Sequence, residues 1–237
     1  MAVDRVKTGI KGFDELIAGG IPKGYLVLVS GQAGSGKTSF GLQFACSNAK
    51  AGNNALFVSL EEEIGNVKNE AVGIGLDVNQ KNLFFEQTNP YDFKRFMDYL
   101  DRTISKTKAK VLVLDSLSSL IFFAPNYTAR YTEDVFTKEV PVDGEAATKI
   151  ALYDLIGMLR KKGVTAMLIG DIPKDSPWYS RDTISEFMCD GVILLYAIEG
   201  EDAFRNLRVA KMRLTKNKAG IYSFQIGKNG VTVKSSE

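Results

Sequence analysis

Runs of apolar residues alternate along this chain with longer stretches in which apolar residues recur every three or four positions. Short apolar runs are typical of buried strands, and the longer period is typical of amphipathic helices. The clearest helix lies within residues 91–106, where apolar residues occupy positions i, i+3, i+4, i+7 and i+11. The predicted strands are Tyr25–Ser30, Ala55–Leu60, Leu83–Gln87, Val111–Asp115 and Val164–Gly170, and the predicted helices are 37–51, 62–74, 91–106 and 145–162.

This alternation of strands and helices predicts an α/β fold with a mostly parallel central sheet flanked by helices. The last part of the chain differs, because short β runs follow one another with turn signals between them. These runs are Gly191–Ile198, Leu207–Leu214, Ile221–Ile226 and Val231–Val233. We expect them to form antiparallel strands at one edge of the sheet. Since no repeat or low-complexity linker interrupts the chain, residues 1–237 are expected to form a single domain.

Composition narrows the function without identifying it. The net charge is +2, so bulk charge favours no class of partner. Residues 201–237 are locally basic, with eight basic and three acidic side chains (8 − 3 = +5). The absence of histidine excludes histidine catalysis and Cys/His zinc sites, and Cys46 and Cys189 lie in apolar stretches typical of buried thiols. Since no signal peptide or membrane-length apolar run is visible, we expect a cytoplasmic protein without membrane contact.

The most informative motif is G-x-x-x-x-G-K-T, which follows the first strand and opens the next helix. In this position the pattern predicts a loop whose backbone N–H groups surround a nucleoside triphosphate at a helix N-terminus. The lysine supplies charge to the β- and γ-phosphates, and the threonine hydroxyl is a Mg²⁺ ligand. The predicted nucleotide-binding residues are Gly31, Gln32, Ala33, Gly34, Ser35, Gly36, Lys37, Thr38 and Ser39.

Acidic residues end three other predicted strands. Asp115 follows Val111–Leu114 and is the expected second residue at the Mg²⁺ site, together with Thr38. Glu61 and Glu62 follow the strand Ala55–Leu60 and are candidates for the base that activates water, although acids also suit the start of a helix. Asp171 ends a further strand and is either a residue that positions water or an ordinary loop acid.

These motifs, in this order, resemble the KaiC-like group of the RecA-like phosphate-loop ATPases, which includes archaeal RadA paralogues. The resemblance covers nearly the whole chain, in segments 8–24, 31–38, 59–62, 111–116, 190–195 and 211–215. It implies ATP and Mg²⁺ as ligands, with Glu61 and Glu62 as catalytic glutamates. It also implies that Lys211 and Arg213, which alternate on a predicted strand, reach the γ-phosphate bound by a neighbouring copy in a hexameric ring or filament.

The chain departs from the family pattern at two places. Asn217 stands where the family commonly has histidine, and the strand ending at Asp171 lacks the common Thr-Thr-Glu-like end. The chain also carries one such domain and not the tandem pair of the circadian clock protein, so a clock function is not inferred.

The leading hypothesis is an oligomeric ATPase or ATP-dependent switch, regulatory or linked to DNA recombination and repair. One alternative is an ATP-binding regulatory subunit that does not hydrolyse ATP and docks on an unknown protein partner. Another is a recombination accessory protein that binds single-stranded DNA through residues 121–144 and 172–182, since aromatic and basic side chains together can stack bases and follow phosphates. These side chains are Tyr127, Arg130, Tyr131, Trp178, Tyr179 and Arg181, which alternatively pack the loops onto the domain.

Overall fold

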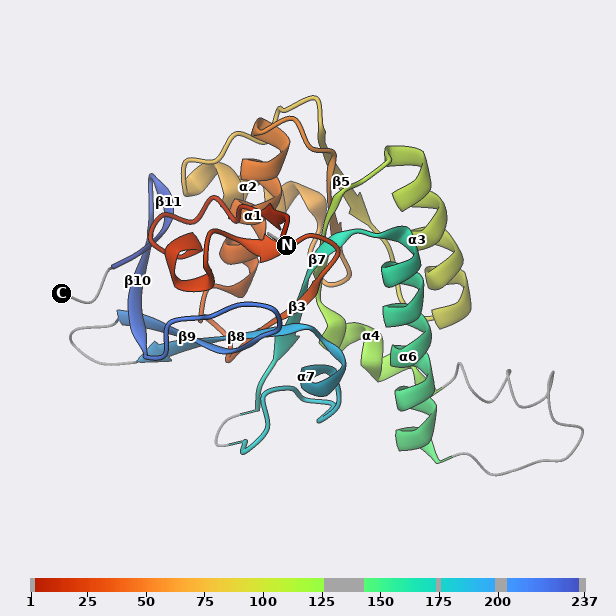
Figure 1. The fold of residues 1–237 in the computed structure, drawn as a ribbon. Coiled ribbons are helices and arrows are strands. Elements are labelled where there is room, and N and C mark those ends of the chain that lie inside the picture. Colours follow the sequence, from red (N-terminus) through yellow and green to blue (C-terminus); the bar gives the residue numbers. More distant parts are fainter. Residues whose placement is uncertain (1–2, 126–142, 174–175, 199–203, 235–237) are drawn as a thin grey trace, which may run out of the picture.

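The computed structural model describes residues 3–125, 143–173, 176–198 and 204–234 (Figure 1). Its main feature is a nine-stranded sheet with the strand order β11-β10-β9-β8-β3-β7-β6-β4-β5. The six strands from β8 to β5 are parallel, which confirms the expected α/β sheet. They are β3 (Leu26–Gly31), β4 (Ala55–Ser59), β5 (Leu83–Gln87), β6 (Val111–Asp115), β7 (Thr165–Asp171) and β8 (Gly191–Ile198).

Antiparallel strands extend the sheet beyond β8, as the sequence predicts. They are β9 (Phe204–Met212), β10 (Tyr222–Gly227) and β11 (Gly230–Val233). The prediction that β9 reaches Leu214 is wrong, because the strand ends at Met212. Leu214 has a left-handed backbone with φ of 51°, and its carbonyl accepts a hydrogen bond of 2.9 Å from the Arg5 guanidinium. Arg213 therefore lies in a turn and does not share a strand face with Lys211.

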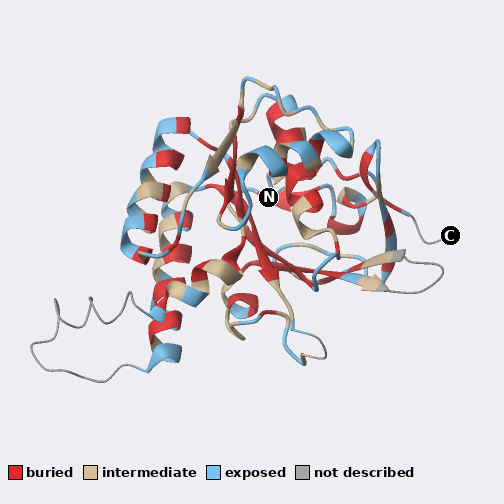
Figure 2. Cartoon of the chain, turned by 180° about the vertical axis from the view of Figure 1, so that it is seen from behind, coloured by how far each residue is buried: buried red, intermediate tan, exposed pale blue. Residues whose placement is uncertain are grey.

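Helices cover both faces of this sheet (Figure 1). They are α1 (Lys37–Lys50), α2 (Ile64–Gly73), α3 (Phe93–Thr107), α4 (Leu117–Phe123), α6 (Gly144–Lys162), the short α7 (Ser185–Met188) and the 3-10 helix η1 (Asp14–Ile17). Helices α1 and α2 pack on the side of Val27 and Val29, whereas α3, α4 and α6 pack on the side of Leu26 and Leu28. Figure 2 shows the strands buried between helices whose outer faces are exposed. Burial on both faces explains the uninterrupted apolar runs of the sequence.

The N-terminal segment packs on the α1 side of the sheet. Its strands β1 (Arg5–Val6) and β2 (Ile21–Pro22) pair with each other, and η1 lies between them. Phe13 is fully buried and meets Phe40 of α1 edge to face, with ring centroids 5.1 Å apart. The segment that precedes the phosphate-loop motif is thus part of the core that supports α1.

Two of the differences from the sequence-based helices bear on the site. The acidic run 61–63 precedes α2, which begins at Ile64, so these acids do not form its first turn. Residues 121–123, predicted to be irregular, form the last turn of α4, while residues 126–142 lie outside the described part of the chain. Within the described ranges, no helix has the length and apolarity needed to cross a membrane.

Candidate nucleotide-binding site

The phosphate-loop motif forms the turn between β3 and α1, as predicted. Gly34 and Gly36 have φ of 74° and 92°, a backbone region that side chains disfavour. A Cβ on Gly31 would lie 2.4 Å from the Leu195 carbonyl oxygen of β8, so glycine is also required where the loop begins. Ser35 is fully buried within this turn, and its hydroxyl has no hydrogen-bond partner among the described residues. The chain therefore bends closely around the space at the N-terminus of α1.

Lys37, the first residue of α1, is held at the loop by two contacts. Its ammonium Nζ donates to the Gln32 carbonyl at 2.9 Å and pairs with Asp171 Oδ1 at 3.1 Å. Strand register explains the ion pair, because Asp171 at the end of β7 is the partner of Gly31 at the end of β3. The predicted acid at this strand end thus lies beside the loop. A phosphate that bound Lys37 would compete with Asp171 for its charge.

Thr38 and Asp115 are the two predicted metal ligands, and the structure brings them together. The Thr38 hydroxyl donates to Asp115 Oδ2 at 2.8 Å. Hydroxyl and carboxylate oxygens are ligands that Mg²⁺ accepts, and nucleotide phosphates and water commonly complete its coordination. Among the described residues, no group of three or more acidic, histidine or cysteine side chains offers a metal site without such help. The pair fits a magnesium ion that arrives with a triphosphate.

Burial raises the pKa of the Asp115 carboxyl to about 7. The Thr38 hydrogen bond and the charge of Lys37 oppose this shift, while the negative charges of Glu61 and Glu62 add to it. Above neutral pH and without a cation, the ionised Asp115 therefore lowers the free energy of unfolding of the protein.

We expect Asp115→Asn to stabilise the protein without nucleotide, in EDTA at pH 8, by about 1–3 kcal/mol. The upper limit is about 4 kcal/mol, the free energy that corresponds to the whole rise in the Asp115 pKa. Because the pKa is raised on folding, the folded state binds more protons between pH 4 and 7, and stability contributed by Asp115 falls over that interval. The advantage of asparagine should therefore grow from pH 4 to 7 and stay level above it. Urea unfolding of both proteins across this range measures it, and equal stability at pH 8 would contradict the prediction.

The candidate base Glu61 lies just beyond β4, next to the start of α4. Its Oε1 accepts hydrogen bonds from the hydroxyls of Ser116 and of Ser119, the latter at 2.6 Å. Glu62 is also exposed, and its backbone N–H donates to the Ser59 hydroxyl at 3.0 Å. Of the two predicted glutamates, Glu61 is the one whose carboxylate is fixed by contacts of the described residues.

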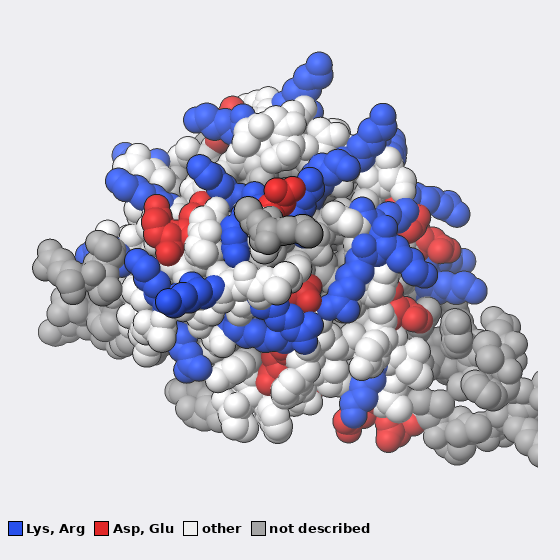
Figure 3. Space-filling view, in the orientation of Figure 1, with Lys and Arg blue, Asp and Glu red and all other residues white. Residues whose placement is uncertain are grey.

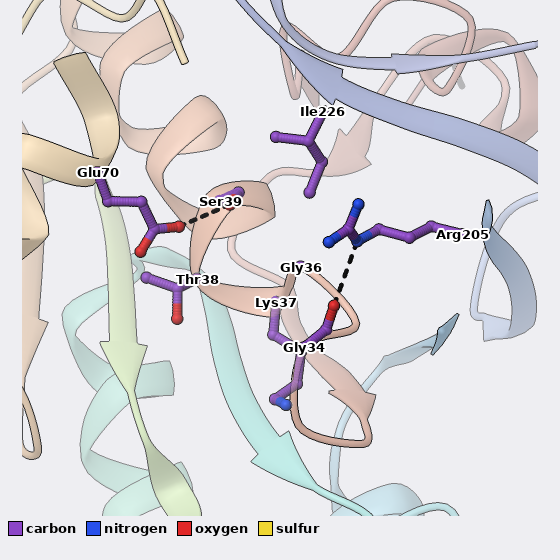
Figure 4. A pocket seen from close by; sticks show the side chains of 8 residues that line it. All are labelled: Gly34, Gly36, Lys37, Thr38, Ser39, Glu70, Arg205 and Ile226. Carbon is purple, nitrogen blue, oxygen red and sulfur yellow. Dashed lines mark hydrogen bonds between the residues drawn. The ribbon is translucent and has the colours of Figure 1, made fainter. Parts of the chain in front are cut away.

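Two cavities adjoin these residues. The first, here called the loop pocket, has a volume of about 400 Å³ (Figure 4). Its lining residues are Gly34, Gly36, Lys37, Thr38, Ser39, Glu70, Arg205 and Ile226. The second, here called the α4 pocket, has a volume of about 520 Å³ and is lined by Glu61, Ser118, Ser119, Ile121, Phe122, Asp171 and Arg181. Lys37 and Asp171, one from each lining, connect the two pockets through their ion pair.

Two polar residues of the loop pocket, besides the apolar Ile226, are absent from the sequence-based prediction. Arg205 of β9 donates to the Gly34 carbonyl at 3.2 Å, and Glu70 of α2 accepts from the Ser39 hydroxyl at 2.6 Å (Figure 4). Neither belongs to a motif, and only the pairing of distant elements brings them to the loop. The basic character of the C-terminal region is the one signal that pointed toward Arg205.

Lys211 and Arg213 lie at the opposite end of the sheet from the phosphate loop of their own chain. Met212 pairs with Gly191, at the start of β8, whereas Gly31 pairs with Leu195, four residues farther along this strand. Four strand residues span about 13 Å. The structure therefore does not bring these two cations to the loop of the same chain.

Both cations contact the turn between α7 and β8. Lys211 Nζ donates to the carbonyls of Phe187 and Cys189, at 3.3 and 2.6 Å, as well as to that of Glu186. Burial and the neighbouring Arg213 lower the pKa of Lys211. Arg213 pairs with Asp190 at 3.4 Å, and its side chain is 54% exposed. Arg213 is thus the more available of the two for contact with another molecule.

Other predicted residues have roles within the chain. The Asn217 side chain donates to the Val209 carbonyl at 3.3 Å. Cys46 and Cys189 are buried, and burial raises the pKa of each thiol to about 12, so neither is a reactive thiolate at neutral pH.

The aromatic and basic residues proposed to bind DNA are described only in part. Tyr127, Arg130 and Tyr131 lie outside the described residues. Tyr179 packs against Arg208, whose guanidinium lies 5.9 Å from the ring centroid, whereas Trp178 is 47% exposed. Lysine and arginine side chains spread over several elements on the face shown in Figure 3, with acidic side chains between them. Among the described residues on this face, acidic side chains interrupt the basic ones, so the charge pattern adds no support for DNA binding.

Comparison with known proteins places these features in a family. A sequence model described as "ATPase: KaiC" matches residues 6–150 and 141–237. The circadian clock oscillator protein KaiC of Prochlorococcus marinus is 29% identical over 252 residues, which cover 98% of this chain and 45% of that protein. The circadian clock protein KaiC3 of Synechocystis is 28% identical over 248 residues, with 98% and 46% coverage. The chain thus spans slightly less than half the length of these relatives.

A solved structure agrees over the whole length. The crystal structure of a KaiC-like protein from the hyperthermophilic archaeon Pyrococcus horikoshii has a TM-score of 0.82 and 32% sequence identity to this chain. The match covers 99% of this chain and 100% of that one. Unlike the clock proteins, this relative has the length of the present chain.

Proposed function

The chain belongs to the KaiC family of ATPases, and on this premise we propose that residues 1–237 act as one domain that binds ATP with Mg²⁺ and hydrolyses it at a site shared by two copies. The observation that carries the proposal is the convergence of Lys37, Thr38, Asp115 and Glu61 at one edge of the sheet. Strand order explains it, because β3, β7, β6 and β4 are neighbours and all end at this edge. An open α/β sheet binds its ligands at the carboxyl ends of its strands.

Each residue has a defined task in hydrolysis. Backbone N–H groups of residues 34–38 and the Lys37 ammonium bind the phosphates, once Asp171 has yielded its ion-pair partner. Thr38 and Asp115 would hold Mg²⁺, which supplies positive charge to the phosphate oxygens. Glu61 accepts a proton from water as the water oxygen bonds to the γ-phosphorus and the bond to the β–γ bridging oxygen breaks.

The position of Lys211 and Arg213 supports a site between copies. Because both lie at the far end of the sheet from their own loop, they serve a nucleotide only if a neighbouring copy presents one. A head-to-tail arrangement, in which each copy offers its loop on one side and these cations on the other, forms a ring or a filament. We infer such a homo-oligomer, with Arg213 as the cation nearest to the neighbour's γ-phosphate.

The test is ATP turnover per subunit measured over a wide range of protein concentrations, with and without single-stranded DNA. Because assembly completes the shared site, we expect turnover per subunit to rise with concentration and then level off. Stimulation by DNA would add a role in recombination, which exposed Trp178 and Arg181 would serve. Tight ATP binding without turnover at any concentration would contradict hydrolysis and favour the regulatory subunit that only binds ATP.

A further inference from the structure

Two serine hydroxyls hold the same oxygen of Glu61. Ser119 donates to Glu61 Oε1 at 2.6 Å, and Ser116 donates to this atom as well. Neither hydroxyl contacts the other carboxylate oxygen, Oε2. Ser116 also caps α4, because its Oγ accepts a hydrogen bond from the Ser119 backbone N–H at 3.2 Å. The helix cap and the hydrogen bonds to Glu61 therefore both lie in the first turn of α4.

The place of α4 in the fold explains this arrangement. The helix starts directly after β6, which lies between β7 and β4 in the sheet. Its first turn therefore stands between Asp171, at the end of β7, and Glu61, just beyond β4. On the other side, the Ser118 hydroxyl accepts a hydrogen bond of 2.8 Å from the Asp171 backbone N–H. Ser118 and Ser119 thus anchor the two sides of the α4 pocket.

Glu61 itself needs such support. It is an exposed residue with a long side chain, and an unrestrained glutamate samples many rotamers. A general base is effective only when it lies within hydrogen-bond reach of the proton that it accepts. Fixing one carboxylate oxygen restricts the rotamers and leaves the other oxygen available for water.

We propose that Ser119 is a positioning residue for hydrolysis, whose hydroxyl fixes Glu61 Oε1 in the α4 pocket so that Oε2 accepts the proton of the attacking water. The inference rests on the proposed function, in which Glu61 is the base. Ser119 touches neither ATP nor water in this role and acts through Glu61 alone. Ser119 is preferable to Ser116 for a test, since the Ser116 hydroxyl also caps the helix.

The experiment measures kcat and KM for ATP in Ser119→Ala, Ser119→Thr, Glu61→Gln and the double variant Glu61→Gln/Ser119→Ala. We expect Ser119→Ala to lower kcat about tenfold with KM unchanged, because orientation matters in the transition state and not in ATP binding. Threonine retains the hydroxyl and should restore kcat to within about twofold of the original protein. In the Glu61→Gln background the alanine substitution should have no further effect, since interacting residues are not additive.

Ser105→Ala is the matched control. Ser105 is also a helix serine with a bonded hydroxyl, but it lies in α3 and donates to the Asp101 carbonyl at 2.9 Å. Its substitution should leave kcat unchanged. If Ser119→Ala keeps a normal kcat while Glu61→Gln is slow, the inference about Ser119 fails and the proposed function stands. The same conclusion follows if Ser119→Ala lowers kcat by the same factor in the Glu61→Gln background as in the original protein, or if Ser119→Thr does not restore kcat. A normal kcat in Glu61→Gln would instead overturn the assignment of the base, and the inference with it.

Discussion

ATP turnover is expected to fall at least about 100-fold when Lys37 is replaced by alanine, because the variant loses the charge closest to the transferred phosphate. Within the chain this ammonium donates to the Gln32 carbonyl and pairs with Asp171. The side chain is only 10% exposed, and these two contacts hold it at the loop. Once Asp171 has yielded it, the ammonium can bind the phosphate without leaving the loop, and the loss of a charge placed in this way is costly.

The fold should tolerate the Lys37 substitution. Asp171 is 39% exposed and is left facing water, so its unpaired charge carries little penalty. Circular dichroism and thermal unfolding show whether the variant keeps its fold and stability. Calorimetric titration with ATP measures the loss of nucleotide binding. Lys50→Ala, at the exposed C-terminal end of the same helix, is the matched control and should keep full turnover. Turnover above half of the original value in folded Lys37→Ala would contradict the assigned role.

The sheet could be predicted from the sequence because parallel strands buried on both faces leave a simple pattern. In β3, successive residues such as Val27 and Leu28 point into separate cores, so both must be apolar. The end of β9 could not be predicted, because it depends on a long-range contact. Arg5, some 200 residues away in the chain, binds the carbonyl of Leu214 and helps to hold the turn there.

The same distinction applies to the site. The meeting of Thr38 with Asp115 follows from the strand–loop–helix motif and from the rule that parallel strands of one sheet end at the same edge, here β3 and β6 with β7 between them. Arg205, in contrast, approaches Gly34 across 171 positions of sequence, through the pairing of β9 with β8 and β8 with β3. The contact of Ser119 with Glu61 depends on side-chain rotamers at a helix start. No periodicity of the sequence encodes such contacts.

Loss of Arg213 is expected to lower turnover about as strongly as loss of Lys37, but through a different copy of the chain. A cation supplied from outside the loop is worth about 10³–10⁵ in rate in related phosphoryl-transfer sites. Within its own chain Arg213 contacts Asp190, which Arg160 also binds at 3.2 Å. Arg213→Ala should therefore lower kcat at least about 100-fold and leave the melting temperature nearly unchanged.

Mixing the two inactive variants distinguishes a shared site from a site within one chain. Lys37→Ala retains Arg213, and Arg213→Ala retains an intact loop. In a head-to-tail assembly formed at random from equal amounts, about one interface in four joins an intact loop to an intact Arg213, so we expect about a quarter of the original turnover. A mixture of Lys37→Ala with Glu61→Gln is the control. Both of these changes affect the same side of the interface, so no combination of subunits restores it. If the first mixture is no more active than the separate variants, Arg213 does not act on the nucleotide of a neighbouring copy. The inferred assembly would then lack its main chemical support.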